Sequence, residues 1–367
     1  MDPSVPNTAR VPIASGGGQP SASEIPPIAP ILTASAASAR YPVTRMTSPL
    51  FLAAARRLVS QKGGNIEQAA KRLVAASGSH GIDLSQVWGT VEYPGGGTRA
   101  VVRQACLSVT GAGRTAMLFV SDPPPEGDPG GPGAALAERS ACIAAACGYF
   151  SGQADRPVRI AQALPDQQEG WVWEAFLAAG FVKVGNLTYM RRAGVSSAGG
   201  VSRPVAWPDG VEVVSFERLA KADERAAQAE VGMALDRSYE GTLDCPEMCG
   251  MRETPDVVLS HRSTGRFDPR LWWIVRLQGV AEGCLLLNPC PELRSVELVY
   301  IGLSPRLRGR GLSKRLLLWG LSLAAGGGRA NWDVTCAVDE RNAPAMSLYR
   351  GLGFKAGARR VALVKVL

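Results

Sequence analysis

The chain has 367 residues, a formal net charge of +8 and an apolar fraction of 46%. This length exceeds that of a typical single domain, so we expect two domains with separate cores. The sequence has no apolar run of membrane-spanning length, and its N-terminus lacks the basic start and apolar core of a secretory signal. These features argue against a membrane-spanning or secreted protein and favour an enzyme of the bacterial cytoplasm.

Charge and cysteine usage argue against two other classes. The basic residues cluster at 306–315, whereas a nucleic-acid-binding surface requires a broader basic face with stacking aromatics. Cys245 and Cys249 have a spacing compatible with zinc, but the chain has only His80 and His261 and no second close cysteine pair follows. We therefore expect reduced thiols, no metal and no nucleic-acid partner.

The chain begins with a segment, residues 1–45, that is rich in Pro, Ser, Ala and Gly and has no periodicity, so we expect it to be disordered. Ser48-Pro49 is typical of a helix start. From there the pattern predicts, in chain order, helices at 50–59 and 66–76, strands at 99–109 and 115–121, a linker at 193–204, a strand at 211–215, a helical segment at 219–236 and a strand at 272–277.

The two halves of the chain resemble each other. One ends IAQALPDQQEGWVWEAFLAAGFVKVGNLTYMRR and the other VTCAVDERNAPAMSLYRGLGFKAGARRVALVKV, so both predict a strand, a polar loop, a short helix, a Gly-Phe turn and a final strand. A long, degenerate repeat of this kind indicates two copies of one domain rather than a solenoid. The sequence therefore predicts an α/β fold with tandem domains at 46–192 and 205–367.

The segment VELVYIGLSPRLRGRGL, residues 296–312, carries the clearest chemical signal. An apolar strand leads into Arg306-x-x-Gly309-x-Gly311, and an amphipathic helix follows directly. Glycines allow the backbone to approach a ligand closely, and the amides of the turn and of the first helical residues are free to donate. This order of elements predicts a pyrophosphate-binding turn, with the arginines adding positive charge beside it.

Strand, Arg-Gly turn and helix together resemble the GNAT superfamily of N-acetyltransferases, in which this turn holds the pyrophosphate of acetyl-CoA. The resemblance implies that each domain is a mixed, mostly antiparallel sheet flanked by helices. It also implies that the pantetheine arm lies where the strand splays from its neighbour near Gly302, although a glycine packed under a large side chain would explain that residue equally. The implied cofactor-binding residues are Ile301, Gly302, Leu303, Arg306, Leu307, Arg308, Gly309, Arg310, Gly311, Leu312 and Asn342.

The same resemblance implies two catalytic residues. Glu297 matches the strand glutamate that serves as general base in the histone-acetylating branch, and a carboxylate can take the proton of an acceptor amine directly or through water. Tyr349 matches the tyrosine that protonates the departing thiolate. The structural alternatives are a strand-end glutamate facing solvent and a buried aromatic ring that packs on Phe354.

The first copy has lost these features. Asp122-Pro123 matches Ser304-Pro305, and Pro124-Pro125-Glu126-Gly127-Asp128-Pro129 then stands where the Arg-Gly turn stands in the second copy. Three prolines remove amide donors and two carboxylates repel a phosphate. Thr115, Glu169 and Phe176 stand opposite Glu297, Asn342 and Tyr349. We therefore expect a degenerate first domain and one working site.

The residues that bind the acceptor are the hardest part of the site to predict from the sequence. Long polar loops within 237–268 are its expected location, and Asp244, Glu247 and Asp268 could each hold an amine or simply stabilise a turn. We expect direct acetyl transfer from acetyl-CoA to the amine of a small molecule or peptide, while the oligomeric state is not readable. Two alternatives stay open: an aminoacyl-transferase of the tandem type, and a non-enzymatic acyl-CoA sensor.

Overall fold

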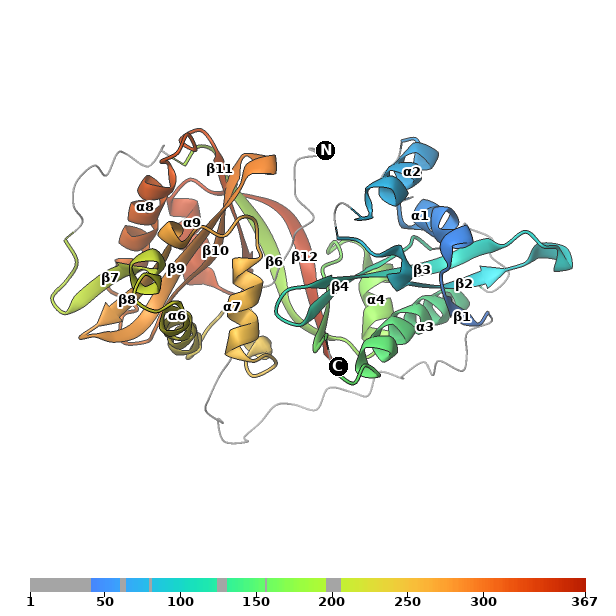
Figure 1. Ribbon diagram of the computed structural model, residues 1–367, viewed down its shortest axis with the longest axis horizontal. Helices are drawn as coiled ribbons and strands as arrows, with labels where there is room; N and C mark the ends of the chain where they lie inside the picture. Colours follow the sequence, from blue (N-terminus) through green and yellow to red (C-terminus); the bar gives the residue numbers. More distant parts are fainter. Residues whose placement is uncertain (1–40, 60–63, 79–80, 124–130, 156, 196–205) are drawn as a thin grey trace. The chain divides into compact units, whose positions relative to one another are not determined.

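In the computed structural model, the chain forms two compact units, each built of a sheet and helices (Figure 1). The structure describes residues 41–59, 64–78, 81–123, 131–155, 157–195 and 206–367. Of these residues, the first unit comprises those up to 183 together with 361–367, and the second comprises 184–360. Most of the segment predicted to be disordered, 1–45, and most of the linker predicted at 193–204 lie outside the described residues.

The first unit is built on a sheet with the strand order β1-β2-β3-β4-β5-β12. Neighbouring strands are antiparallel except β4 and β5, which are parallel. Its elements are β1 (Val43–Arg45), α1 (Phe51–Val59), α2 (Ile66–Ala76), β2 (Val87–Glu92), β3 (Val101–Gly111), β4 (Thr115–Val120), α3 (Gly131–Ser151), β5 (Ile160–Ala163), α4 (Gly170–Ala178) and the end of β12 (Lys355–Val366).

The second unit has the strand order β6-β11-β10-β9-β8-β7, and here β10 and β11 form the parallel pair. Its elements are β6 (Val182–Arg192), β7 (Val211–Ser215), α5 (Phe216–Ala220), α6 (Glu224–Tyr239), α7 (Thr254–Arg262), β8 (Trp272–Leu277), β9 (Val280–Cys290), β10 (Ser295–Leu303), α8 (Leu312–Ala324), β11 (Asp333–Asp339) and α9 (Ala343–Gly351). The sheets are therefore mixed and mostly antiparallel, as predicted.

The two units exchange their last strands. Strand β6 follows α4 in the sequence, yet it pairs with β11 and belongs to the second unit from Val184 onward. The C-terminal residues of β12 pair with β5 and belong to the first unit. The domain boundaries predicted at 46–192 and 205–367 follow the sequence repeat. The compact units differ from them because most of β6 belongs to the second unit and the end of β12 to the first.

The repeat is visible in matching backbone geometry. After α4, the amide of Phe181 donates to the carbonyl of Phe176 at 3.0 Å, and after α9 the amide of Phe354 donates to the carbonyl of Tyr349 at 3.0 Å. Both turns contain a glycine in the left-handed region, Gly180 at φ +84° and Gly353 at φ +83°. Only glycine adopts this conformation without strain, so the Gly-Phe signal in each half marks the same turn.

The predicted helices and strands are found in the described residues, one of them divided in two. The helical segment predicted at 219–236 is two helices, because Asp223 caps a new helix with its side chain on the amide of Ala226. The sequence reading did not predict β1, β2, α3, α7 or β9. Of these, α3 is alanine-rich and has many buried residues, so it shows no amphipathic stripe. None of the described helices is long and apolar enough to cross a bilayer.

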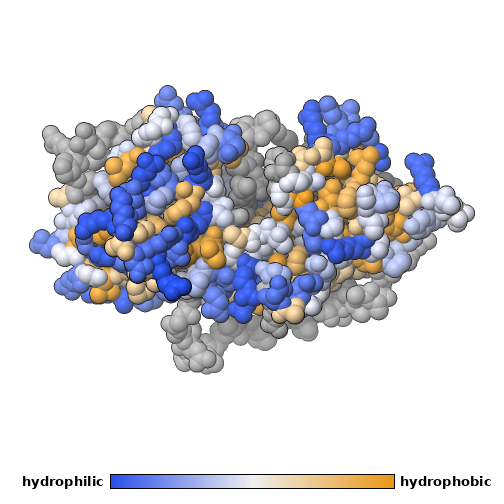
Figure 2. Space-filling model, viewed as in Figure 1, coloured by the Kyte–Doolittle hydropathy of each residue, from blue (hydrophilic) through white to orange (hydrophobic). Residues whose placement is uncertain are grey.

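Helices cover both faces of the second sheet. Leu285 and Leu287 of β9 share a core with Leu316 and Leu321 of α8, while side chains alternate along the strand so that Leu286 points to the other face, where α6 packs. The first unit has its own cores, and in one view apolar residues gather on its surface over α1 while α2 is mostly hydrophilic (Figure 2).

Candidate active site

A cavity opens where β10 and β11 part. The two strands pair in parallel only from Ser295 to Glu297, and β10 continues to Leu303 bonded to β9 alone. A β-bulge between Leu298 and Tyr300 bends the strand at this point. Beyond Glu297, one edge of β10 is therefore without a strand partner among the described residues, and it exposes backbone groups to the cavity.

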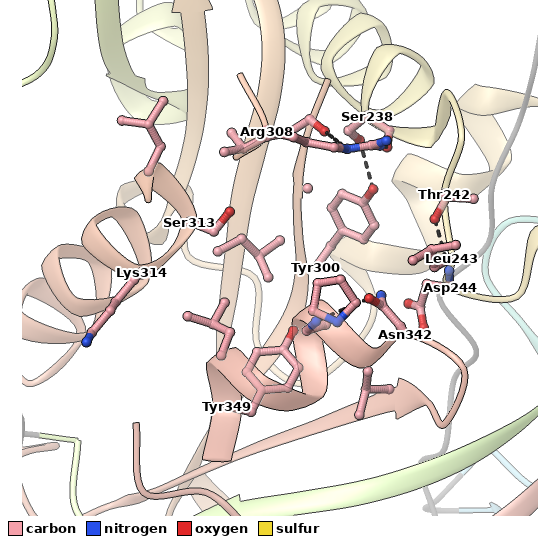
Figure 3. A pocket seen from close by; sticks show the side chains of 18 of the residues that line it. Ser238, Thr242, Leu243, Asp244, Tyr300, Arg308, Ser313, Lys314, Asn342 and Tyr349 are labelled. Atoms are coloured by element: carbon pink, nitrogen blue, oxygen red, sulfur yellow. Dashed lines mark hydrogen bonds between the residues drawn. The ribbon is translucent and has the colours of Figure 1, made fainter. Parts of the chain in front are cut away.

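The cavity has a volume of about 350 Å³ and is lined by β10, the turn after it, the start of α8, α9 and the end of α6 (Figure 3). Most of the predicted cofactor-binding residues lie in its wall: Ile301, Gly302, Leu303, Leu307, Arg308, Gly309, Gly311, Leu312 and Asn342. Tyr349 also lines it. Glu297, Arg306 and Arg310 are not in the lining.

The turn before α8 presents free amides. Gly309 and Gly311 have φ values of +75° and +70°, and α8 starts without a side-chain cap. Within the described part of the chain, the amides from Gly309 to Lys314 have no acceptor. A helix N-terminus with unbonded amides carries partial positive charge and is suited to a phosphate.

Two of the three arginines of the turn contact groups of the protein itself. Arg306 pairs at 2.7 Å with Glu282, a buried carboxylate that Arg237 also contacts. Arg308 donates to the carbonyls of Leu303, Gly241 and Ser238, and so ties the turn to the end of α6. The side chain that adds charge to the cavity wall, besides Arg308, is Lys314 in the first turn of α8.

Glu297 lies at the point where the two strands part. Its carboxylate accepts a hydrogen bond from the hydroxyl of Thr335, the residue opposite it on β11. Burial raises the pKa of Glu297 to about 7, and the Thr335 hydrogen bond opposes this rise. A carboxylate with a pKa near neutrality is suited to accept a proton, because it is ionised often enough and still basic.

Tyr349 is buried in the wall of the cavity and its ring packs on Phe354 with centroids 5.5 Å apart. Its hydroxyl has no hydrogen-bond partner among the described residues. Burial raises the pKa of Tyr349 well above its ordinary value, and nearby Cys336 and Asp244 add to the effect. The hydroxyl is therefore protonated at neutral pH and available to donate into the cavity.

Gly302 has a packing role as well as a place in the cavity wall. A Cβ on Gly302 would lie against the hydroxyl of Tyr300 and 2.6 Å from a carbon of its ring. Tyr300 is buried and its hydroxyl shares a 2.8 Å hydrogen bond with Ser238 of α6. The close approach that requires a glycine here is thus the side chain two residues earlier in the same strand.

The matching place in the first unit has no equivalent chemistry. Phe176 packs on Phe181 with centroids 5.0 Å apart, as Tyr349 does on Phe354, but it has no hydroxyl. The parallel register pairs Met117 with Gln162, as it pairs Glu297 with Thr335. By this register Met117 stands at the place of the glutamate, two residues from Thr115, which the sequence alignment had placed there.

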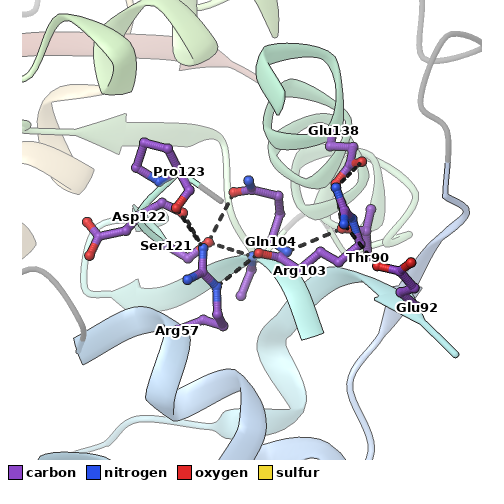
Figure 4. A network of polar contacts seen from close by, with 10 residues as sticks. Arg57, Thr90, Glu92, Arg103, Gln104, Ser121, Asp122, Pro123 and Glu138 are labelled. Carbon is purple, nitrogen blue, oxygen red and sulfur yellow. Dashed lines mark hydrogen bonds and ion pairs between the residues drawn. The ribbon is translucent and has the colours of Figure 1, made fainter. Parts of the chain in front are cut away.

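The end of β4 is closed by a side chain of its own unit. Arg57 of α1 donates to the carbonyls of Arg103, Asp122 and Pro123, while Gln104 and Ser121 bond to each other beside it (Figure 4). The prolines and carboxylates expected to block a phosphate, at 124–129, lie outside the described residues. The second unit has unbonded amides after β10, whereas at the end of β4 in the first unit Arg57 is bound to carbonyls.

The cysteine pair considered for zinc does not converge in space on other ligands. Cys245 is buried and Cys249 is exposed. In the part of the chain that the structure describes, no three His, Cys, Asp or Glu side chains form a group that could hold a metal.

Comparisons with known proteins fit this geometry. Residues 235–354 match the model of the acetyltransferase (GNAT) family. The second unit therefore contains a segment similar to the GNAT acetyltransferases. A mycothiol acetyltransferase from Nocardioides is 28% identical over 179 residues, which is 48% of this chain and 59% of the relative, so the chain spans less than two thirds of that protein's length. The family match lies within the second unit and includes the Arg-Gly turn, Glu297 and Tyr349.

The fold of the whole chain is also that of a GNAT protein. A crystal structure described as a GCN5-related N-acetyltransferase from Sphaerobacter thermophilus superposes with a TM-score of 0.51 at 18% identity. The similarity covers 89% of this chain and 96% of the other. This similarity is one of fold, and it extends over both copies of the internal repeat.

The sequence reading missed two residues of the cavity wall and the hydrogen-bond partner of Glu297. Ser313 follows the Arg-Gly turn directly and lines the cavity, as does Ser238 at the end of α6. The position of Ser313 in the first turn of a predicted helix could have identified it, since side chains there lie beside the free amides. Ser238 and Thr335 gave no local signal, because their places depend on packing and on strand register.

Proposed function

We propose that the second unit transfers the acetyl group of acetyl-CoA to the amine of a small molecule or peptide. The observation that carries this proposal is the run of amides from Gly309 to Lys314 without acceptors among the described residues, beside a strand edge without a partner there. The first feature suits a pyrophosphate and the second suits the amide groups of an extended pantetheine arm.

The residues present fit such a ligand. The cavity connects the turn with Tyr349, so a molecule bound at the turn by its phosphates reaches the tyrosine with its other end. Lys314 and Arg308 supply positive charge in the wall, and Leu303, Leu307 and Leu348 supply apolar surface. This order of charged, extended and apolar surface along one cavity matches the chemistry of an acyl-CoA.

In the proposed reaction Glu297, through water, takes one proton from the ammonium form of the acceptor. The amine nitrogen then forms a bond to the acetyl carbonyl carbon, and the carbon–sulfur bond breaks. Backbone amides at the open edge of β10 stabilise the negative charge on the oxygen. Tyr349 gives its proton to the departing thiolate, and the remaining extra proton of the nitrogen passes through water to the tyrosinate, so a free thiol, a neutral amide and the restored tyrosine result.

A charge placed at the turn tests the cofactor assignment. Ser313→Glu puts a carboxylate among the free amides, which stabilises the start of a helix but repels a phosphate. We expect acetyl-CoA to raise the melting temperature of the wild type and of Ser313→Gln, and to have no effect on Ser313→Glu. Ser322→Glu, in the same helix but outside the cavity, should behave as the wild type.

Equal stabilisation of all four proteins would refute the cofactor assignment. Acyl transfer itself is measured by the release of free thiol from acetyl-CoA with a panel of primary amines. Stabilisation by acetyl-CoA without thiol release for any amine would favour a sensor, and thiol release that depends on the amine would exclude it.

A further inference from the structure

The loop between α6 and α7 contains two of the three carboxylates that the sequence offered as acceptor ligands, and the structure separates all three. Asp268 caps the short turn at Pro269 and pairs at 2.8 Å with Arg270. Glu247 pairs with Arg341 through both carboxylate oxygens. Asp244 alone of the three lines the cavity. Asp268 and Glu247 are bound to arginines outside the cavity wall, so Asp244 is the remaining candidate to bind the acceptor.

Asp244 presents a charge that makes no ion pair with the described residues, although the guanidinium of Arg341 is near enough to lower its pKa. One carboxylate oxygen accepts the amide of Asp339 at 2.8 Å. No cation of the described residues lies within ion-pair distance of it. Desolvation raises the pKa of Asp244 to about 6, so the group is still mostly ionised at neutral pH. An anion held in a partly dehydrated wall without an ion pair is costly, and a cationic ligand would reduce that cost.

The loop holds Asp244 in place before any ligand arrives. Cys245 has a left-handed backbone, with φ +45°, and its amide donates to the carboxylate of Asp339 at 3.1 Å. Arg341 bonds to Asp339 and to Glu247 at the same time, and so clamps the loop onto the end of β11. A Cβ on Gly185 of β6 would lie 2.7 Å from Asp339, so a glycine makes room for this clamp.

The position of Asp244 fits the reacting end of the cavity. It shares the wall with Asn342 and Tyr349, whereas Lys314 lies on the opposite side of the cavity (Figure 3). The cavity is thus cationic where a pyrophosphate is proposed to bind and anionic near the tyrosine. Leu243 and Leu348 add apolar surface beside the carboxylate.

We propose that Asp244 binds the ammonium group of the acceptor in this cavity, so that the acceptor is a primary aliphatic amine that enters in its protonated form. The inference rests on the proposed function for the identity of the reaction, but the cation site itself is independent of it. Asp244 is a substrate-binding residue here, and Glu297 keeps the role of taking the proton.

A simple ammonium ion tests this site without knowledge of the natural acceptor. The melting temperature of the full chain is measured with n-butylammonium chloride, with sodium chloride at equal ionic strength and with n-butanol. Asp244→Asn keeps an oxygen for the amide of Asp339 and removes the charge, and Asp268→Asn is the matched control. We expect n-butylammonium to stabilise the wild type and Asp268→Asn more than either reference does, and this difference to vanish in Asp244→Asn.

Equal shifts in the wild type and Asp244→Asn, or no specific shift in the wild type, would overturn the proposal. Where the amine panel yields a substrate, Asp244→Asn should raise its KM at least tenfold while acetyl-CoA still stabilises the protein. If acetyl-CoA fails to bind but the ammonium shift depends on Asp244, the proposed function fails and the cation site stands. If acetyl-CoA binds and the ammonium shift is the same in both proteins, only the cation site fails.

Discussion

The substitution Glu297→Gln should change how the stability of the protein depends on pH. The pKa of Glu297 rises from 4.5 to about 7 on folding because the carboxylate is desolvated. Between these values the folded protein holds a proton that the unfolded chain has lost, so the free energy of unfolding falls as pH rises. The glutamine of the variant would not titrate, and its amide oxygen can still accept the hydrogen bond of Thr335.

The size of the effect follows from the pKa difference. One pKa unit corresponds to about 1.4 kcal/mol, so deprotonation of Glu297 between pH 5 and pH 8 costs the folded state at most about 2.5 kcal/mol. Water reaches part of this side chain and reduces the cost, so we expect a loss of about 2 kcal/mol. At pH 5 the two proteins should have similar stability, and at pH 8 the variant should be the more stable one.

Urea unfolding followed by tryptophan fluorescence at pH 5 and pH 8 measures this difference. Glu292→Gln removes an exposed carboxylate five residues earlier and serves as the control for a change in net charge. If the stability difference between the wild type and Glu297→Gln is the same at both pH values, the carboxylate is not desolvated and the reasoning about its role as a base is wrong.

Three further changes test other parts of the site. Tyr349→Phe should lower turnover roughly 10²-fold, the effect of losing one acid catalyst, while acetyl-CoA binds unchanged; Phe176 demonstrates that a phenylalanine packs at the matching place, and equal turnover would remove the tyrosine from the mechanism. Gly302→Ala should lower the melting temperature because its methyl group meets the Tyr300 ring, and an unchanged value would contradict that packing. Arg341→Ala should release the loop clamp and speed hydrogen exchange at the Cys245 amide; slow exchange in the variant would mean that the clamp is unnecessary.

The sequence was informative where the signal is local. The Gly-Phe turns depend on a glycine with positive φ, and Gly180 and Gly353 both have one. The Arg-Gly turn was readable for the same reason, since Gly309 and Gly311 adopt left-handed backbones that other residues avoid. Such positions are fixed by the conformation of one residue, so a single sequence is enough to recognise them.

Features that depend on partners distant in the sequence could not be predicted. The partners that Arg306 and Arg308 have within the protein are of this kind: Arg306 pairs with Glu282 on another strand, and Arg308 donates to carbonyls of α6 and β10. The exchange of the last strands is likewise a matter of pairing, because β6 can complete either sheet by its own pattern. Asp244 could not be separated from Glu247 and Asp268 until their ion pairs were known.

Hydrogen exchange with and without acetyl-CoA tests the central claim most directly, that one unit of this tandem protein binds the cofactor through its turn amides. We predict that acetyl-CoA slows exchange at residues 309–314 and along β10 from Leu298 to Leu303, and leaves residues 131–136 at the start of α3 unchanged. Protection at the start of α3 instead, or no protection in either unit, would contradict the assignment of the site.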